Sequence, residues 1–103
     1  MKLSIRDEAG DEAAYHVAWF RARNRQVGDR LSELFVETIR EIACRPTSFP
    51  LLEYPENPGN IRRARLKKFP LIIIYQLFDN EIDVLTVAHT SQDYGYWRSR
   101  LRN

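Results

Sequence analysis

Alternating cations in the stretch IRRARLKKF, residues 61–69, are the clearest chemical signal in the sequence. Alternate residues of a β-strand share a face, so Arg63, Arg65 and Lys67 are predicted to form a line of charge with a spacing of about 6.6 Å. On an open sheet face, such a line suits a phosphate backbone or an acidic polypeptide. Solvated edge strands also carry cations, because charge discourages aggregation between edges. The composition of the strand leaves both interpretations open.

His89 is the candidate for proton transfer. It ends the predicted last strand EIDVLTVAH, and regular alternation puts it on the same face as Asp83, Leu85 and Val87. An imidazole titrates near neutral pH, so at a strand end beside a basic surface it can act as a general acid or base. A histidine with a purely structural role is the commoner case.

The C-terminal segment interleaves aromatic residues with arginines. Tyr94, Tyr96 and Trp97 are followed by Arg98 and Arg100. Such a mixture can stack on bases and hold phosphates, or it can pin the C-terminus onto the sheet. We expect Trp97 to pack, and we keep Tyr96 as a second candidate for proton transfer.

The residues expected to bind nucleic acid or a protein partner are the basic ones of the strand and tail: Arg63, Arg65, Lys67, Lys68, Arg98 and Arg100. The catalytic candidates are His89, Tyr96, Arg63 and Arg65, in which the arginines would hold a phosphate. No spacing of His, Cys, Asp and Glu predicts a metal site. With four glycines there is no glycine-rich phosphate loop, and no cofactor is expected.

Composition predicts a cytoplasmic protein. The 16 Lys and Arg residues against 14 Asp and Glu give a net charge of +2. The single Cys44 cannot form an internal disulfide, which favours a reducing compartment, and we expect it to be a small core residue. The N-terminus lacks the apolar region of a signal peptide, and the longest apolar run, PLIIIYQLF, is too short to cross a membrane.

The N-terminal half predicts a strand and two helices. The stretch KLSIR alternates as a short strand, and Asp7 can cap a helix that runs from near Glu8 to Asn24. Residues 26–45 form the most periodic segment, which Pro46 ends. The very short link between the helices predicts an antiparallel hairpin. Its apolar residues Val17, Phe20, Leu31, Phe35 and Ile39 should pack against the Ile73 or Ile74 side of the sheet.

The C-terminal half predicts three strands. A proline-rich loop, residues 47–60, precedes strands at 61–69, 71–78 and 81–89. Asp79 and Asn80 should form a tight turn between the last two strands, since both tolerate positive φ. The predicted fold is α+β in the order β-α-α-β-β-β, with the helical hairpin on one face of a small, mainly antiparallel sheet. We expect a single domain over residues 1–103.

Several segments together resemble the RelE/ParE toxin superfamily. The stretch from Glu12 to Pro50 is similar to its helical hairpin, including the Trp19-Phe20 pair. The stretch IRRARLKKFPLIIIY is similar to the family's basic strand and FP step, VLTVAH to its last strand, and DYGYWRSR to its closing segment. The order of these motifs, which span nearly the whole chain, makes the resemblance fairly specific.

This resemblance implies the toxin half of a type II toxin–antitoxin or plasmid stabilisation system, which inhibits growth until a cognate antitoxin binds it. RelE-like members cleave ribosome-bound mRNA without a metal, as endoribonucleases, whereas ParE-like members inhibit DNA gyrase. RelE-like nucleases usually carry arginines where this chain has Ile72 and Gln92. That difference mildly favours the non-catalytic class, so enzyme activity stays open, and a degenerate member that only binds antitoxin is a third possibility.

Overall fold

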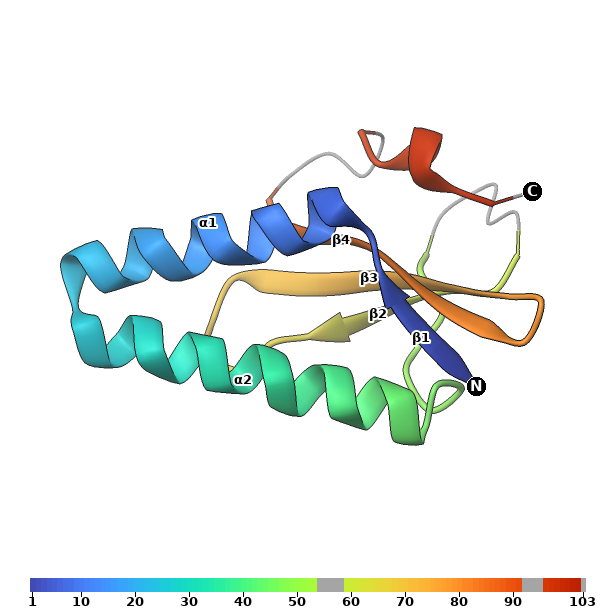
Figure 1. The fold of residues 1–103 in the computed structure, drawn as a ribbon, viewed down its shortest axis with the longest axis horizontal. Coiled ribbons are helices and arrows are strands. Elements are labelled where there is room, and N and C mark those ends of the chain that lie inside the picture. The colour runs from blue at the N-terminus through green and yellow to red at the C-terminus, as the bar shows by residue number, and fades with distance from the viewer. Residues whose placement is uncertain (54–58, 92–95, 103) are drawn as a thin grey trace.

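The chain follows the predicted order of elements. The computed structural model describes residues 1–53, 59–91 and 96–102. Its elements are β1 Lys2–Ile5, α1 Asp7–Arg23, α2 Arg25–Cys44, β2 Ile61–Arg65, β3 Leu71–Phe78, β4 Glu81–His89 and a short 3₁₀ turn Arg98–Arg100. The two helices lie side by side as a hairpin against the sheet (Figure 1). The predicted α+β fold is therefore confirmed.

The four strands form one mixed sheet in the order β1-β4-β3-β2. β1 runs parallel to β4, and the other two pairs are antiparallel. Asp79 and Asn80 make the β3–β4 turn with φ values of 51° and 59°, as their side chains predict. No helix among the described residues is long and apolar enough to cross a membrane.

Short-range chemistry explains the hairpin. Asn24 ends α1 and caps α2, where its side-chain oxygen accepts the Val27 amide hydrogen at 3.2 Å. A Cβ added at Gly28 would lie 2.5 Å from Arg21 Cγ and 2.7 Å from its Cα, so only glycine allows the helices to approach this closely. The predicted cap of α1 was wrong by one position, because Asp7 is already helical and Arg6 precedes the helix.

The main core lies between the helices and one face of the sheet, which we call the helix-side face. Leu31, Phe35 and Ile42 of α2 are buried against Ile73 and Val87 of the sheet. Val17, Phe20 and Ile39 pack around them. The predicted packing is confirmed, and it falls on the Ile73 side. Cys44 is exposed at the end of α2, so its expected place in the core was wrong.

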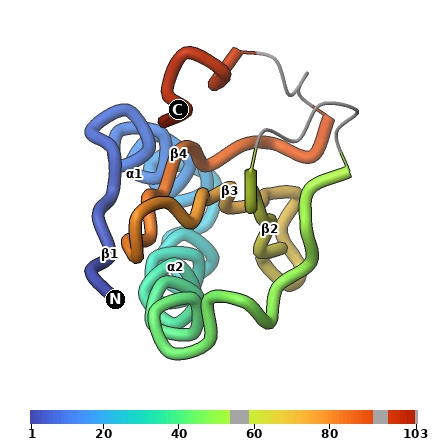
Figure 2. The backbone as a smooth tube through the Cα atoms, turned by 90° about the vertical axis from the view of Figure 1, so that its right-hand side faces the viewer, coloured from blue at the N-terminus to red at the C-terminus, as the bar shows by residue number. Residues whose placement is uncertain are grey.

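The opposite face of the sheet is also covered, contrary to the prediction of an open face. We call residues 96–102 the strap and this face the strap-side face; Figure 2 shows the strap and α2 on opposite sides of the strands. Trp97 is fully buried there, within a second core that contains Leu52, Ile61, Ile72, Ile74, Leu85 and Ala88. The prediction failed because it counted only helices as cover, whereas a short irregular segment also excludes water.

The basic strand is shorter than predicted. β2 ends at Arg65, and residues 66–69 form a tight turn in which the Leu66 amide donates to the Leu71 carbonyl at 3.0 Å. Lys68 adopts a φ of 69° within this turn. Lys67 therefore lies in the turn and does not extend the line of charge along the strand.

Candidate functional site

A β-bulge decides which face His89 occupies. Ile74 pairs with Thr86 and Tyr75 pairs with Val84, which leaves Leu85 as an extra residue on β4. The alternation of β4 reverses at that point, so the predicted grouping of His89 with Asp83 and Leu85 was wrong. His89 pairs with Leu71, a member of the main core, and therefore lies on the helix-side face.

Arg63 and Arg65 lie on the strap-side face. They pair with Ile74 and Ile72, which belong to the second core. Arg63 is half-buried, and Arg65 is exposed, as are Lys67 and Lys68 in the neighbouring turn. Within the described residues these four side chains make no ion pair or hydrogen bond, so they are available to an anionic partner.

Arg62 has a structural role instead. Its guanidinium donates to the carbonyl oxygens of Thr47 and Phe49 at 3.0 and 2.6 Å. The Tyr75 hydroxyl donates to the Pro46 carbonyl at 2.6 Å on the same side, and burial raises the Tyr75 pKa to about 12. These bonds fix the chain that follows α2 beside the sheet.

The polar side chains of the strap form a network with α1 and β4. The hydroxyls of Tyr96 and Thr86 are 2.7 Å apart, and Thr86 donates to Glu12 Oε1 at 2.8 Å. Arg100 donates to the same carboxylate oxygen at 3.1 Å and to the Leu85 carbonyl at 2.9 Å. The Arg100 side chain is only 15% exposed. This predicted binding residue is thus engaged within the molecule.

Tyr96 is 40% exposed, but its environment disfavours ionisation. Burial raises the pKa of its hydroxyl, and the Glu12 carboxylate adds to the rise against the opposing effects of Thr86 and Arg100. Arg98 is exposed in the 3₁₀ turn. Tyr94 and Gln92 lie outside the described residues.

A second set of contacts fastens the far end of the strap. Gln76 is 1% exposed, and its side-chain amide donates to the Arg102 carbonyl at 3.1 Å while its oxygen accepts the Arg102 amide hydrogen at 3.0 Å. Arg102 also pairs with Glu81 at 2.9 Å. Arg100 and Arg102 therefore both hold the strap on the sheet. The prediction that the tail is a binding arm did not include this structural role.

The structure does not bring the predicted catalytic groups together. His89 lies on the helix-side face, while Arg63, Arg65 and Tyr96 lie on the other side of the sheet. A general acid must be within hydrogen-bond reach of the group whose proton it moves. No cluster of three or more potential metal ligands occurs in the described part of the chain.

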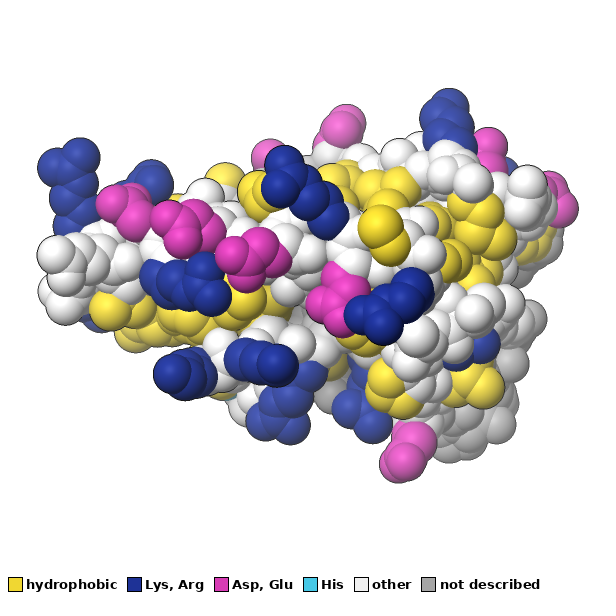
Figure 3. All heavy atoms as spheres, turned by 90° about the horizontal axis from the view of Figure 1, so that it is seen from below, with side chains coloured by type: hydrophobic (Ala, Val, Ile, Leu, Met, Phe, Trp, Pro, Cys, Tyr) yellow, Lys and Arg dark blue, Asp and Glu magenta, His cyan; other side chains and the backbone are white. Residues whose placement is uncertain are grey.

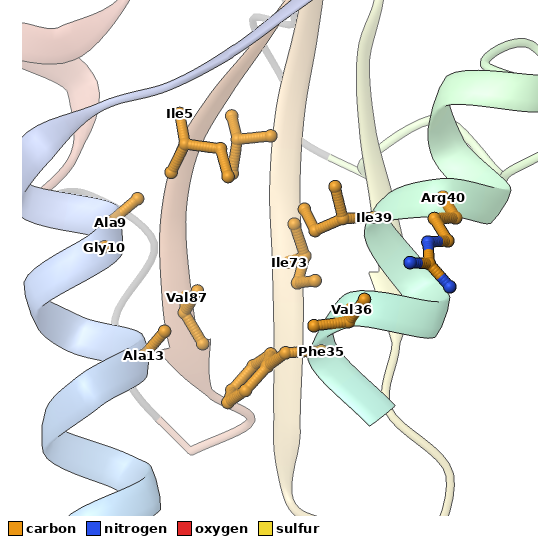
Figure 4. Close-up of a pocket in the computed structure, with 11 residues that line it drawn as sticks. Ile5, Ala9, Gly10, Ala13, Phe35, Val36, Ile39, Arg40, Ile73 and Val87 are labelled. Atoms are coloured by element: carbon orange, nitrogen blue, oxygen red, sulfur yellow. The ribbon is translucent and has the colours of Figure 1, made fainter. Parts of the chain in front are cut away.

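An apolar groove between the two helices is the feature that sequence reasoning missed. It encloses about 360 Å³, with Ala9, Gly10 and Ala13 of α1 on one side. The other lining residues are Ile5, Phe35, Val36, Ile39, Arg40, Ile73, Val84 and Val87. Figure 4 shows Phe35 and Ile39 of α2 facing α1 across Ile73 and Val87 of the sheet, with Arg40 at the α2 margin. The small residues on α1 were its sequence signal, because they leave space opposite Phe35.

The margins of the groove expose large apolar side chains. Ile5 is 47% exposed and Val36 is 49% exposed at its margins, although both are large and apolar. Ion pairs run along the outer surface of α2, from Arg30 to Glu33 and Glu37 at 3.3 and 3.2 Å. Figure 3 shows charged side chains in a row with exposed apolar side chains beside them. An apolar patch bordered by charge is typical of a protein-binding surface.

The comparisons with known proteins agree with this architecture. The sequence model of a family described as ParE toxin of type II toxin-antitoxin system, parDE, matches residues 4–94. A solved structure titled "Chromosomal ParDE TA system from P. aeruginosa" matches with a TM-score of 0.71 and 14% identity, covering 86% of this chain and 95% of that chain. At that identity the likeness shows a shared fold. No curated protein matches the chain.

Proposed function

The chain belongs to the ParE toxin family and is the toxin of a type II toxin–antitoxin system, and we propose that it arrests growth as a non-catalytic inhibitor of DNA gyrase. We further propose that it acts in the cytoplasm and that an antitoxin encoded beside it neutralises it by filling the apolar groove. Gyrase is the target that resemblance to the ParE branch implies.

One observation carries the non-catalytic assignment. Cleavage of RNA requires phosphate-binding cations and a proton-transfer group around one phosphorus atom. Here His89 and the Arg63–Arg65 pair are on opposite faces of the sheet, and Arg100 is held by Glu12. Ile72, where the resembling nucleases usually carry an arginine, belongs to the second core. The arrangement supports binding to a target over chemistry on it.

Cellular assays can separate the two mechanisms. After induction of the toxin alone, we expect intact mRNA by primer extension together with a DNA-damage response, because stalled gyrase leaves broken DNA. Discrete in-frame cuts in the mRNA within minutes would instead support the RelE-like nuclease. The observation that favours this alternative is that Arg63 and Arg65 are unpaired among the described residues and could hold a phosphate. Normal growth with confirmed folded protein would point to a degenerate member.

The groove has the properties that an antitoxin segment requires. Its walls and floor are almost wholly apolar, so an amphipathic helix or an extended apolar segment would bury them from water. Arg40 at the margin offers a partner for an acidic residue of that segment. A neutralising partner bound here would also cover Ile5 and Val36, the exposed apolar residues of this surface.

Gly10 provides a direct test of this docking site. A Cβ added there meets no atom within 4 Å, so a large side chain can fill the groove with little effect on the fold. Gly10→Trp should weaken antitoxin binding by about a hundredfold, as expected when an anchor pocket worth about 3 kcal/mol is blocked. Isothermal titration with the purified antitoxin measures the loss.

Gly10→Ala is the matched control for the Trp variant. It adds one methyl group and stabilises α1 by about 0.5–1 kcal/mol, because alanine is the better helix former. Antitoxin affinity should stay within about threefold of the parent, since a single methyl leaves most of the groove open. Full affinity in both variants would place the antitoxin elsewhere and leave the gyrase proposal intact.

A further inference from the structure

A second hollow lies on the other flank of α1, away from the apolar groove. Tyr15, His16 and Trp19 form its helical wall, and Pro70, Leu71 and His89 close it from the sheet, around a volume of about 490 Å³. We propose that this pocket binds a nucleoside phosphate, with the base against the aromatic side chains and the phosphate on the lysines of the adjoining turn. Nothing in the proposed gyrase inhibition or antitoxin binding requires this pocket.

The walls of the pocket suit a planar ring. Tyr15 and Trp19 are 66% and 43% exposed, which is unusual for large aromatic residues in a molecule with two buried cores. Edge-to-face contacts hold the rings, with centroids 5.6 Å apart for Tyr15 and His16 and 4.9 Å apart for Trp19 and Phe20. The Arg23 guanidinium lies over the Trp19 ring, 3.5 Å from its centroid, so a base would stack on Tyr15 and on the part of Trp19 that Arg23 leaves open. Such stacking gains contact area without demanding a particular sequence.

His16 favours a base over a hydrocarbon side chain as the occupant. Burial lowers the pKa of its imidazole, and the nearby His89 lowers it further, which favours the uncharged ring. A neutral imidazole has one donor and one acceptor nitrogen, and one of them contacts the Val87 backbone. A polar heterocycle can form a hydrogen bond with the other nitrogen, whereas a hydrocarbon would exclude water and leave that nitrogen without a hydrogen-bond partner.

Two lysines lie in the turn that leads into the pocket. Lys67 and Lys68 are exposed and make no ion pair within the described residues. The turn that carries them continues into Pro70 and Leu71 of the pocket. The Phe69 ring packs on Phe20 with centroids 5.1 Å apart, which fixes this turn beside the end of α1. The ring-binding walls and the charge are therefore adjacent, as a nucleoside phosphate requires.

The two tryptophans of the chain provide a built-in test. Trp19 lines the pocket, whereas Trp97 is fully buried on the other side of the sheet. Titration of the ¹⁵N-labelled chain with AMP, CMP, GMP and UMP should shift the Trp19 indole signal in a saturable way and leave the Trp97 signal in place. Four-nucleotide RNA and DNA strands form a second arm, which distinguishes a free nucleotide from a nucleic-acid strand as the source.

Variants separate the base from the phosphate. His16→Phe should weaken binding about tenfold, the cost of one hydrogen bond, and Lys67→Ala should weaken AMP binding but not adenosine binding. Lys2→Ala, at an exposed lysine of β1, is the matched control and should bind as the parent does. Circular dichroism confirms that each variant is folded.

Three results would overturn the proposal. The first is a Trp19 signal that no mononucleotide or oligonucleotide moves. The second is equal affinity for adenosine and AMP, which would remove the phosphate from the site. The third is an equal response to phenylalaninamide, which would make the pocket a docking point for an aromatic side chain of a protein. The Gly10→Trp and gyrase results stand apart from all three.

Discussion

The two faces of the sheet are covered in different ways, although the same strands build both. On the helix-side face, α1 and α2 form a layer that is parted by an apolar groove over Ile73 and Val87. On the strap-side face, the short strap seals Ile72 and Ile74 under Trp97. Hydrogen bonds from Arg100 to Glu12 and between Arg102 and Gln76 hold this thinner cover on the sheet.

We infer from this difference that the helix-side face binds a partner, whereas the strap-side face mainly stabilises the fold. The helix-side face leaves apolar surface uncovered, so it can gain free energy when a partner fills the groove. The strap-side face has little apolar surface left, and it presents the unpaired cations of Arg63 and Arg65 at its edge strand. A protein partner is therefore expected in the apolar groove of the first face, and Arg63 and Arg65 offer a separate site for an anionic partner beside the second.

Truncation of one large aromatic residue in each core, Trp97 and Phe35, tests whether both faces of the sheet carry a hydrophobic core. Trp97→Ala and Phe35→Ala should each lower the free energy of unfolding by about 3–5 kcal/mol, with Phe35 near the lower limit because it already borders the groove. Denaturant unfolding monitored by circular dichroism gives both values. A loss below about 1 kcal/mol for Trp97→Ala would mean that the strap does not cover the sheet.

Removal of a strap contact should have a smaller effect. Arg100→Ala leaves the largely covered Glu12 without its cation, and the expected loss of stability is about 1–2 kcal/mol after allowance for solvent around the pair. Arg30→Ala, in exposed ion pairs on α2, is the control and should leave the free energy of unfolding nearly unchanged, because solvent screens these pairs. Equal losses in the two variants would contradict a special role for the strap network.

The smallest effect concerns the titration of His16. Its pKa lies below the ordinary value of 6.5 because of burial and then the charge of His89. The folded chain therefore holds fewer protons than the unfolded chain, and this contribution to stability is lost as the pH falls below about 6.5. NMR should show that His89→Gln raises the His16 midpoint, whereas Arg63→Gln leaves it unchanged. If only Arg63→Gln shifted the His16 midpoint, Arg63 would have to lie near His16 on the helix-side face, which would contradict the structure.

Local chemistry made most of the fold predictable. The stripe on α2 that contains Leu31 and Phe35 follows from 3.6-residue periodicity, and the Asp79-Asn80 turn follows from side chains that tolerate positive φ. The central position of β3 follows from its apolar residues on both faces. Apolar residues on both faces of β3 also require that both faces of the sheet be covered, and this requirement already indicated a segment such as the strap.

The candidate site was less predictable because it depends on long-range register. A bulge opposite Ile74 and Tyr75 reverses the alternation of β4, and neither glycine nor proline occurs in the strand to mark it. The turn at Lys68 likewise removes Lys67 from the strand. The groove depends on how the two helices are spaced, so the small residues Ala9, Gly10 and Ala13 of α1 mark one wall but do not by themselves predict it.

The direct measurement is the supercoiling activity of purified gyrase titrated with the parent chain and with His89→Ala. Both proteins should inhibit supercoiling with potencies within about threefold of each other, because non-catalytic inhibition involves no proton transfer by His89. Supercoiling unaffected by the parent chain, together with mRNA cleavage that His89→Ala abolishes, would contradict non-catalytic inhibition of gyrase.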